Sequence, residues 1–227
     1  MNKVIKERLK TSKVISIILL ILTKVPFNNK IKFRGKNNKL VNEGGGVFKS
    51  KIEIIGDNNT ILIEQMVRMR NCRIVIHGNN NLIHIKKGSY FDEVGMCIDF
   101  NKNEIVIGEN TIINKGSHFS CMEGTFIRIG NDCLFSAEVT CRTGDSHSII
   151  DKSGKRINHS QNIIIENHVW AGAKATFLKG AYVPADSVVA MLSVVTKSFQ
   201  KSGVVLAGIP SHIVKENINW DSRIISK

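Results

Sequence analysis

Residues 165–195 read IENHVWAGAKATFLKGAYVPADSVVAMLSVV, and an apolar residue returns in this stretch at every sixth position. These positions are Ile165, Ala171, Phe177, Val183, Val189 and Val195. Four residues after each of the first five stands a small or β-branched residue, namely Val169, Ala175, Ala181, Ser187 and Ser193. A period of six is neither the 3.6 of a helix nor the 2 of a strand, so it indicates a short strand followed by a corner. Three such units close one coil of a solenoid, with the apolar residue pointing inward.

The same period runs upstream of this stretch. It places two further sets of residues inward, which are Ile107, Ile113 and Phe119, and Ile129, Phe135 and Cys141. Before residue 107 the repeat is looser, with segments such as IEIIGDNN at 52–59 and IVIHGNNN at 74–81. Gly and Asn are suited to the strained backbone angles of the corners. The repeat therefore predicts that residues from about 30 to 200 form an all-β solenoid of roughly eight or nine coils.

Composition excludes several classes of protein. The chain has 227 residues with 42% apolar residues, enough for one buried core and too many for a disordered chain. Its longest unbroken apolar run, residues 17–22, is far shorter than the twenty or so residues of a spanning helix. The five cysteines form no C-x-x-C pair, which favours free thiols in a reducing cytoplasm over zinc or disulfides. Cys141 falls at an inward position and is expected in the core.

Positive charge is concentrated at the N-terminus. Residues 1–40 hold eleven Lys and Arg against one acid, Glu7, within a formal net charge of +13 for the chain. Apolar residues interleave with these at roughly helical spacing, so we expect a basic amphipathic helix over residues 1–27. It either caps the solenoid with a solvated basic face or contacts an anionic membrane or polymer. Because no aromatic residue precedes Phe27, nucleic acid is not an expected partner. The solenoid then spans 28–200, and residues 201–227 form a C-terminal extension that caps it.

Three stretches resemble one enzyme family. They are RTGDSHSI at 142–149, IENHVWAGA at 165–173 with LKG at 178–180, and SVVTK at 193–197 with AGIPS at 207–211. Together they are similar to the hexapeptide-repeat acyltransferases, and most similar to O-acetyltransferases of capsule or lipopolysaccharide sugars, sialic acid polymers included. The resemblance implies a left-handed parallel β-helix, acetyl-CoA as donor, and a homotrimer with its sites between subunits. A cytoplasmic enzyme is expected from the free cysteines. Two departures from the family pattern are Ala171, where Ile is commoner, and Ser211-His212, where Ala-Lys is commoner.

Acetyl transfer to a hydroxyl needs a base for the hydroxyl proton and donors for the developing oxyanion. His147 is the expected base, because it lies in a polar loop that breaks the repeat and resembles the family's catalytic-histidine loop. Asp145, two residues away, is expected to fix the ring tautomer. The resemblance places Trp170 beside the thioester, although an indole also packs well between coils. A covalent route through Cys141 is not expected, so transfer is direct within a ternary complex.

Further residues are assigned to the ligands, each with an ordinary structural alternative. Gly172 and Ala190 would let coenzyme A approach the backbone closely, or simply suit a corner. Lys197 would meet a phosphate of coenzyme A, or be a solvated lysine of the last coil. Lys155 and Arg156 would bind an anionic acceptor from the loop that carries His147. No metal site is expected.

Three other functions stay open at this point. The first is N-acetylation of an amino-sugar nucleotide, although no G-x-G-x-x-G follows a strand. The second is a metal-dependent hydratase on the same solenoid, for which His147 and His168 have no clear third histidine. The third is a non-catalytic solenoid that binds polyanions, which binding of acetyl-CoA would exclude.

Overall fold

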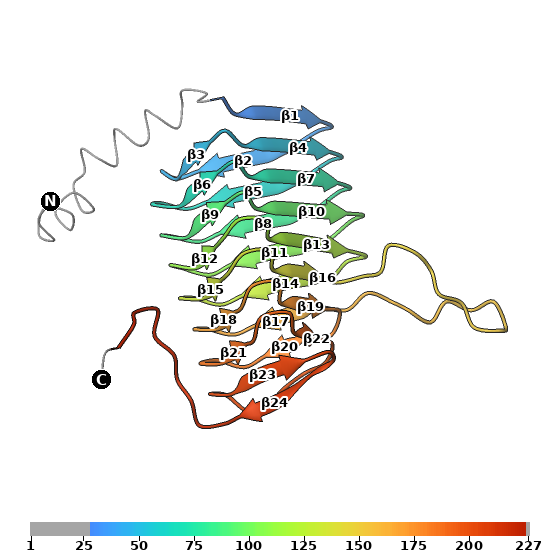
Figure 1. The fold of residues 1–227 in the computed structure, drawn as a ribbon. Helices are drawn as coiled ribbons and strands as arrows, with labels where there is room; N and C mark the ends of the chain where they lie inside the picture. Colours follow the sequence, from blue (N-terminus) through green and yellow to red (C-terminus); the bar gives the residue numbers. More distant parts are fainter. Residues whose placement is uncertain (1–27, 226–227) are drawn as a thin grey trace, which may run out of the picture.

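The computed structural model describes residues 28–225, and they form a parallel β-helix with three faces (Figure 1). The predicted all-β solenoid is therefore confirmed, while the expected N-terminal helix over 1–27 lies outside the described residues. No helix in the described part of the chain is long and apolar enough to cross a membrane. The predicted boundaries of the three segments stay predictions.

Each coil contributes one strand to each of three sheets. Sheet A contains β1 (Lys30–Arg34), β4 (Lys51–Ile55), β7 (Arg73–His77), β10 (Gly95–Asp99), β13 (His118–Met122), β16 (Thr140–Arg142), β19 (Thr176–Leu178) and β22 (Val194–Val195). Sheet B contains β2 (Lys39–Asn42), β5 (Thr60–Ile63), β8 (Leu82–Ile85), β11 (Glu104–Ile107), β14 (Phe126–Ile129), β17 (Ile163–Ile165) and β20 (Tyr182–Val183). Sheet C contains β3 (Gly46–Phe48), β6 (Arg68–Arg70), β9 (Tyr90–Asp92), β12 (Ile112–Ile113), β15 (Leu134–Phe135), β18 (Trp170–Ala171), β21 (Val188–Val189), β23 (Val205–Gly208) and β24 (Ser211–Lys215). All pairings are parallel except that of β23 with β24.

The coils have two lengths. In the C-terminal coils Trp170 pairs with Val188, an offset of 18 residues that equals three units of six. In the N-terminal coils Ile52 pairs with Ile74 and Ile74 with Met96, an offset of 22. The difference comes from five-residue strands in sheet A and from longer Asn-rich corners, which is why the period of six is loose upstream. A loop of residues 143–160, here called the arm, raises the offset between Ile127 and Ile163 to 36.

The core is a stack of side chains that point inward from strands β2 to β24, whereas all five residues of β1 are exposed. All twelve positions predicted to face inward, from Ile107 to Val195, are buried. Phe119, Phe135 and Phe177 follow one another along the axis with ring centroids 6.1 Å apart. The small residues predicted at the corners are buried as well, and Cys141 lies in the core as expected. Of the five free cysteines, only Cys97 is half-buried on an outer face.

Buried asparagines form a ladder along the corner between sheets A and B. Asn81 Oδ1 accepts a hydrogen bond from the backbone N–H of Asn103 at 2.8 Å, and Asn81 Nδ2 donates to Asn59 Oδ1 at 3.0 Å. The same amide also donates to the backbone oxygen of Phe100 at 2.9 Å. Each asparagine thus satisfies backbone groups that the turn leaves without a strand partner. The Asn residues noted in the sequence therefore connect one coil to the next.

We predict that Asn81→Ala lowers the free energy of unfolding by about 2 kcal/mol, because it leaves the buried backbone N–H of Asn103 and the half-buried backbone oxygen of Phe100 without these partners. Urea unfolding followed by circular dichroism measures this loss. Asn114→Ala is the control, since Asn114 is only half-buried and donates one bond, to Phe135. Equal midpoints for the two variants would contradict a structural role for the ladder.

Candidate active site

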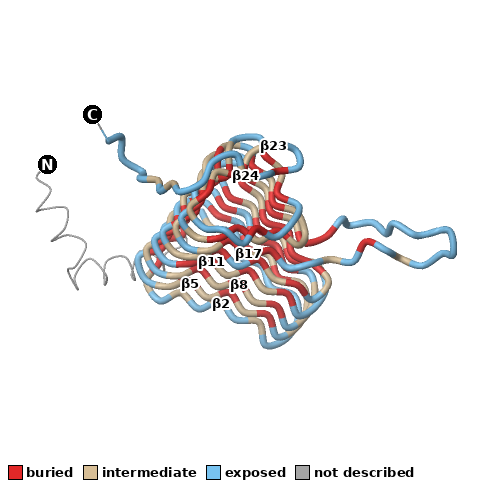
Figure 2. Tube along the Cα trace, turned by 90° about the horizontal axis from the view of Figure 1, so that it is seen from below, coloured by how far each residue is buried: buried red, intermediate tan, exposed pale blue. Residues whose placement is uncertain are grey.

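The arm that carries His147 leaves the solenoid after β16 and returns to it at β17 (Figure 1). It is an antiparallel hairpin in which the N–H of Ile157 donates to the oxygen of Ile149 at 2.9 Å. Figure 2 shows that it projects outward from the coils rather than lying against them. The solenoid tolerates this insertion because the strand register of sheet B continues in β17, which pairs with β14.

Asn158, which was not anticipated from the sequence, connects the two limbs of the arm at its base. Its amide nitrogen donates to the backbone oxygen of His147 at 2.8 Å, and its amide oxygen accepts from the N–H of Ile149 at 2.7 Å. Asn158 is buried, whereas His147 is exposed. The backbone at His147 and just after it is therefore held, while the imidazole faces solvent.

Asp145 is placed differently from the expectation that it orients the His147 ring. Its Oδ2 atom accepts hydrogen bonds from Asn158 at 2.8 Å and from the ammonium of Lys179. The Lys179 ammonium, followed by the Asn158 amide, lowers the pKa of the Asp145 carboxyl. Because Lys179 follows β19, this ion pair fastens the start of the arm to the next coil. Asp145 thus acts on the backbone that bears His147 and not on its imidazole.

Arg156 is engaged within the arm as well. Its guanidinium forms a two-point ion pair with Glu123, with Nη2 and Oε2 3.0 Å apart, and Ser160 also donates to this carboxylate. Arg156, then Ser160, lowers the pKa of Glu123 to about 2. The guanidinium of Arg156 is thus already engaged by Glu123, and its assignment to an acceptor carboxylate stays a prediction. Lys155 is exposed at the tip of the arm, and its assignment to the acceptor stays a prediction.

A second candidate region lies on sheet C. Trp170, Gly172 and Ala190 line one groove of about 380 Å³, together with Ser136, Ala173, Val188, Val189 and Met191. The indole of Trp170 is 39% exposed and donates to Ser136 Oγ at 3.3 Å. Three residues assigned to the donor from the sequence are therefore brought together. The groove is mostly apolar, which suits a pantetheine arm.

Gly172 also has a structural reason to be glycine. A Cβ atom at this position would lie 2.6 Å from the backbone nitrogen of Met191 in the next coil. A side chain is thus excluded by the close approach of two coils. This agrees with the structural alternative given above, that Gly172 suits a corner of the solenoid. Ala190 remains a small residue on the wall of the groove.

Lys197 does not join this groove within one chain. It lies two residues beyond β22 of sheet A, one coil after Lys179, and its ammonium stands 5.4 Å from the ring centroid of Phe199. The groove with Trp170 is on sheet C. The assignment of Lys197 to a phosphate of coenzyme A stays a prediction, and a single subunit does not explain it.

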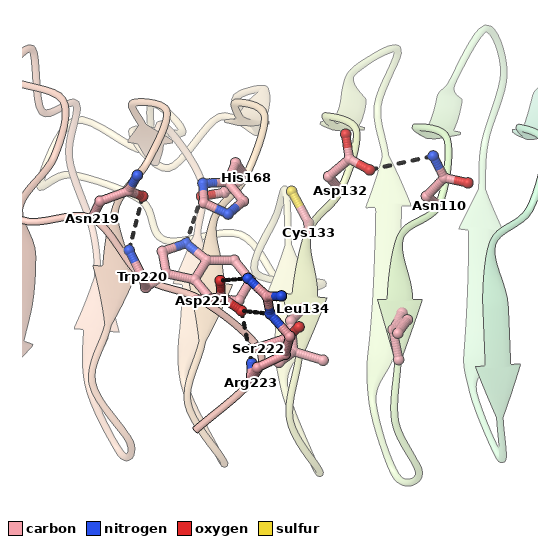
Figure 3. A pocket seen from close by; sticks show the side chains of 11 residues that line it. Asn110, Asp132, Cys133, Leu134, His168, Asn219, Trp220, Asp221, Ser222 and Arg223 are labelled. Atoms are coloured by element: carbon pink, nitrogen blue, oxygen red, sulfur yellow. Dashed lines mark hydrogen bonds and ion pairs between the residues drawn. The ribbon is translucent and has the colours of Figure 1, made fainter. Parts of the chain in front are cut away.

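The C-terminal tail borders the Trp170 region, another feature missed in the sequence. Figure 3 shows Trp220 lying beside His168, with a ring stacking distance of 4.4 Å. Its indole N–H donates to the backbone oxygen of His168 at 2.7 Å, and its ring centroid is 6.1 Å from that of Trp170. A lone tryptophan in a polar tail was the only signal for this contact in the sequence.

The described residues separate the two halves of the expected site. His147 is on an arm between sheets A and B, whereas the groove with Trp170 is on sheet C. Cys141 is fully buried, and burial raises the pKa of its thiol far above the ordinary value. A buried, neutral thiol is a poor nucleophile, so the core reading of Cys141 is confirmed. Within residues 28–225, no three His, Cys, Asp or Glu residues are grouped as metal ligands.

Comparison with known proteins places the chain in a family. No family model matches it. It is 33% identical over 177 residues to a polysialic acid O-acetyltransferase of Neisseria meningitidis, covering 77% of this chain and 81% of the relative. The structure of the polySia-specific acetyltransferase NeuO has a TM-score of 0.82 and 30% identity, over 88% of this chain and 92% of that one.

A second solved structure, the polysialic acid O-acetyltransferase OatWY, has a TM-score of 0.63 and 27% identity. The match covers 87% of this chain and 90% of the OatWY chain. These similarities extend over the solenoid rather than over the repeat motifs alone. This chain therefore belongs to the family of polysialic acid O-acetyltransferases, hexapeptide-repeat enzymes with a left-handed parallel β-helix.

Proposed function

We propose that this enzyme transfers the acetyl group of acetyl-CoA to a hydroxyl of a bacterial surface polysaccharide, with a sialic acid polymer as the acceptor. The observation that carries this proposal is the match of most of the chain to a polysialic acid O-acetyltransferase. The exposed His147 on its anchored arm and the apolar groove beside Trp170 support it.

The transfer is direct. The imidazole of His147 takes the proton of the acceptor hydroxyl as its oxygen attacks the thioester carbonyl carbon. The tetrahedral intermediate then expels the thiolate of coenzyme A, which recovers the proton from the imidazolium. The apolar groove holds the pantetheine arm against Trp170, and a donor beside it stabilises the oxyanion. Asn158, Asp145 and Lys179 position His147 through the backbone of the arm.

The site is completed by a second copy of the chain, in a homotrimer. One chain keeps the arm of His147 apart from the groove of Trp170, so a neighbouring subunit would supply the missing half. The arm also exposes three isoleucines, Ile149, Ile150 and Ile157, at 55%, 61% and 59%. Exposed apolar side chains gathered on one projecting element are typical of an interface.

Location in the cytoplasm, with peripheral contact to its membrane, is part of the same proposal. The five free cysteines suit a reducing compartment. The basic N-terminal residues, which lie outside the described residues, would be attracted to an anionic lipid surface.

We predict that His147→Ala lowers kcat by about a thousandfold, since general base catalysis contributes factors of that order. The measurement is release of coenzyme A with sialic acid polymer as acceptor, together with binding of acetyl-CoA, which should persist. His159→Ala is the matched control, because His159 is an exposed histidine at the base of the same arm. Release with amino-sugar nucleotides alone would refute O-acetylation and favour the N-acetyl reading.

Mixing two inactive variants tests the shared site. We predict that His147→Ala and Trp170→Ala are each nearly inactive alone, and that unfolding and refolding them together at equal amounts restores about a quarter of the wild-type rate. That fraction follows because random assembly pairs an intact His147 of one chain with an intact Trp170 of its neighbour at one site in four. Activity no higher than that of the separate variants would contradict a site built by two chains.

The anchor of the arm should tolerate mild acid. Because the pKa of Glu123 is lowered to about 2 from an ordinary 4.5, its contribution is present above pH 4.5 and is lost only as the pH falls towards 2. We therefore predict that proteolysis of the arm is equally slow between about pH 5 and 8. Glu123→Gln should speed it several-fold, whereas Glu109→Gln, an exposed carboxylate elsewhere, should not. Cleavage of the wild-type arm that accelerates already at pH 5 would show that another group anchors it.

A further inference from the structure

The outer face of sheet A is hollowed next to the arm, at a place that the mechanism does not use. Two adjoining hollows of about 440 and 460 Å³ share His77 and Asp99 as lining residues. We call them together the sheet A groove. Its other lining residues are Arg73, Val75, Gly95, Met96, Cys97 and His118 in one part, and Phe100, Met122 and Ser146 in the other. Ser146 directly precedes His147, so the groove reaches the backbone of the expected base.

Gly95 lines the hollow and leaves room there for the ring of His118. It lies in β10 between Arg73 of β7 and His118 of β13, with which it is in register. A Cβ atom at position 95 would lie 2.8 Å from Cδ2 of His118. Glycine inside a strand weakens it and marks a place where another group approaches closely. The groove is thus a feature of the strand itself and not a gap between loops.

Two arginines without carboxylate partners stand on this face. Within residues 28–225, the ion pairs of arginines engage Arg70, Arg128, Arg156 and Arg223, and neither Arg73 nor Arg142 is among them. Arg73 lines the groove, and Arg142 donates to the hydroxyl of Ser146 at 2.9 Å. Three strand spacings separate β7 from β16, or about 14 Å. The face therefore offers two cations spaced along the axis of the solenoid.

The groove also contains one carboxylate, that of Asp99, whose Oδ1 atom lies 3.4 Å from Nδ1 of His77. His118 and Cys97 are polar groups without charge at neutral pH. Burial, and then the charge of Arg142, lowers the pKa of His118, so its imidazole is neutral and can hydrogen-bond a hydroxyl. Burial, and then Asp99, raises the pKa of Cys97 to about 11, which keeps the thiol protonated and unreactive. Val75, which is buried, gives the groove an apolar floor. Cations above an apolar floor suit the carboxylates and ring faces of acidic sugars.

We propose that the sheet A groove binds the acidic sugar units of the acceptor polymer, with Arg73 and Arg142 contacting carboxylates of different units along the solenoid axis. This inference rests on the proposed function and assigns its acceptor to a defined face. A polymer longer than the groove continues towards the N-terminal coils. There Lys51 and Lys30 stand in register with Arg73, although Lys51 also contacts Glu53 at 3.4 Å.

The test compares one charge variant, one shape variant and one control. Arg73→Gln removes a cation, and Gly95→Val fills the hollow without changing the charge. Arg73→Gln should raise KM for sialic acid polymer about tenfold, as expected for the loss of a charged hydrogen bond. Gly95→Val should raise it by a similar factor, because its side chain occupies space that the sugar needs, and both variants should leave KM for acetyl-CoA unchanged. Arg68→Gln, in the same coil on sheet C and equally exposed, should keep the wild-type KM. Thermal unfolding verifies that all three variants fold.

Direct binding separates this inference from the proposed function. Calorimetry with His147→Ala protein, without acetyl-CoA, should detect salt-sensitive binding of sialic acid polymer and no binding of neutral dextran. Adding Arg73→Gln or Gly95→Val should weaken that binding about tenfold. Wild-type transfer with unaltered polymer binding in both variants would overturn the groove and leave the function standing. Polymer binding lost in the variants, without acetyl transfer by wild type, would support the groove and refute the proposed function.

Discussion

The stacking of each coil on its neighbours in strict register is the constraint on which the rest of the structure depends. Backbone hydrogen bonds run from coil to coil, and the strands from β2 onward contribute side chains to one continuous interior column. Stability is nearly one-dimensional in such a solenoid, since a coil touches only those above and below it. The outer faces are therefore free to vary, provided that the inward positions and corners are kept.

The functional features are departures that respect this constraint. The arm adds residues between β16 and β17 without disturbing the register, because Ile127 still pairs with Ile163. Ion pairs of the arm with Lys179 and Glu123 connect it to the coils, and hydrogen bonds of Asn158 connect its two limbs to each other. Gly95 is a second departure, in which a missing side chain hollows an otherwise regular sheet. Both lie where we propose that a ligand or another subunit binds.

Much of the fold, and part of the site, could be predicted from the sequence. The period of six predicted that Phe119, Phe135 and Phe177 lie in the core, and Trp170 and Ala190, both assigned to the donor from the sequence, line one groove. The partners of charged groups could not be predicted in this way. Asp145 was matched with its neighbour in the chain, whereas its partner Lys179 is 34 residues away. Ion pairs of this kind depend on which corners of neighbouring coils stack on each other. The long arm between Asp145 and Lys179 interrupts the period of six, so the sequence does not show that these two residues are neighbours.

The sequence by itself determined the solenoid and its interior. The reason is that an inward apolar residue recurs at short, regular intervals along the chain, so the pattern can be recognised without knowing which coils are neighbours. Only the tertiary structure decided what stands on the outside. Arg73, Gly95 and His118 become neighbours because these coils contain 22 or 23 residues rather than 18. The number of residues in a coil depends on how many residues its corners contain. Which residues then pair is fixed by the hydrogen bonds between neighbouring coils. Surface columns, and the groove they form, therefore appear only when the coils are stacked.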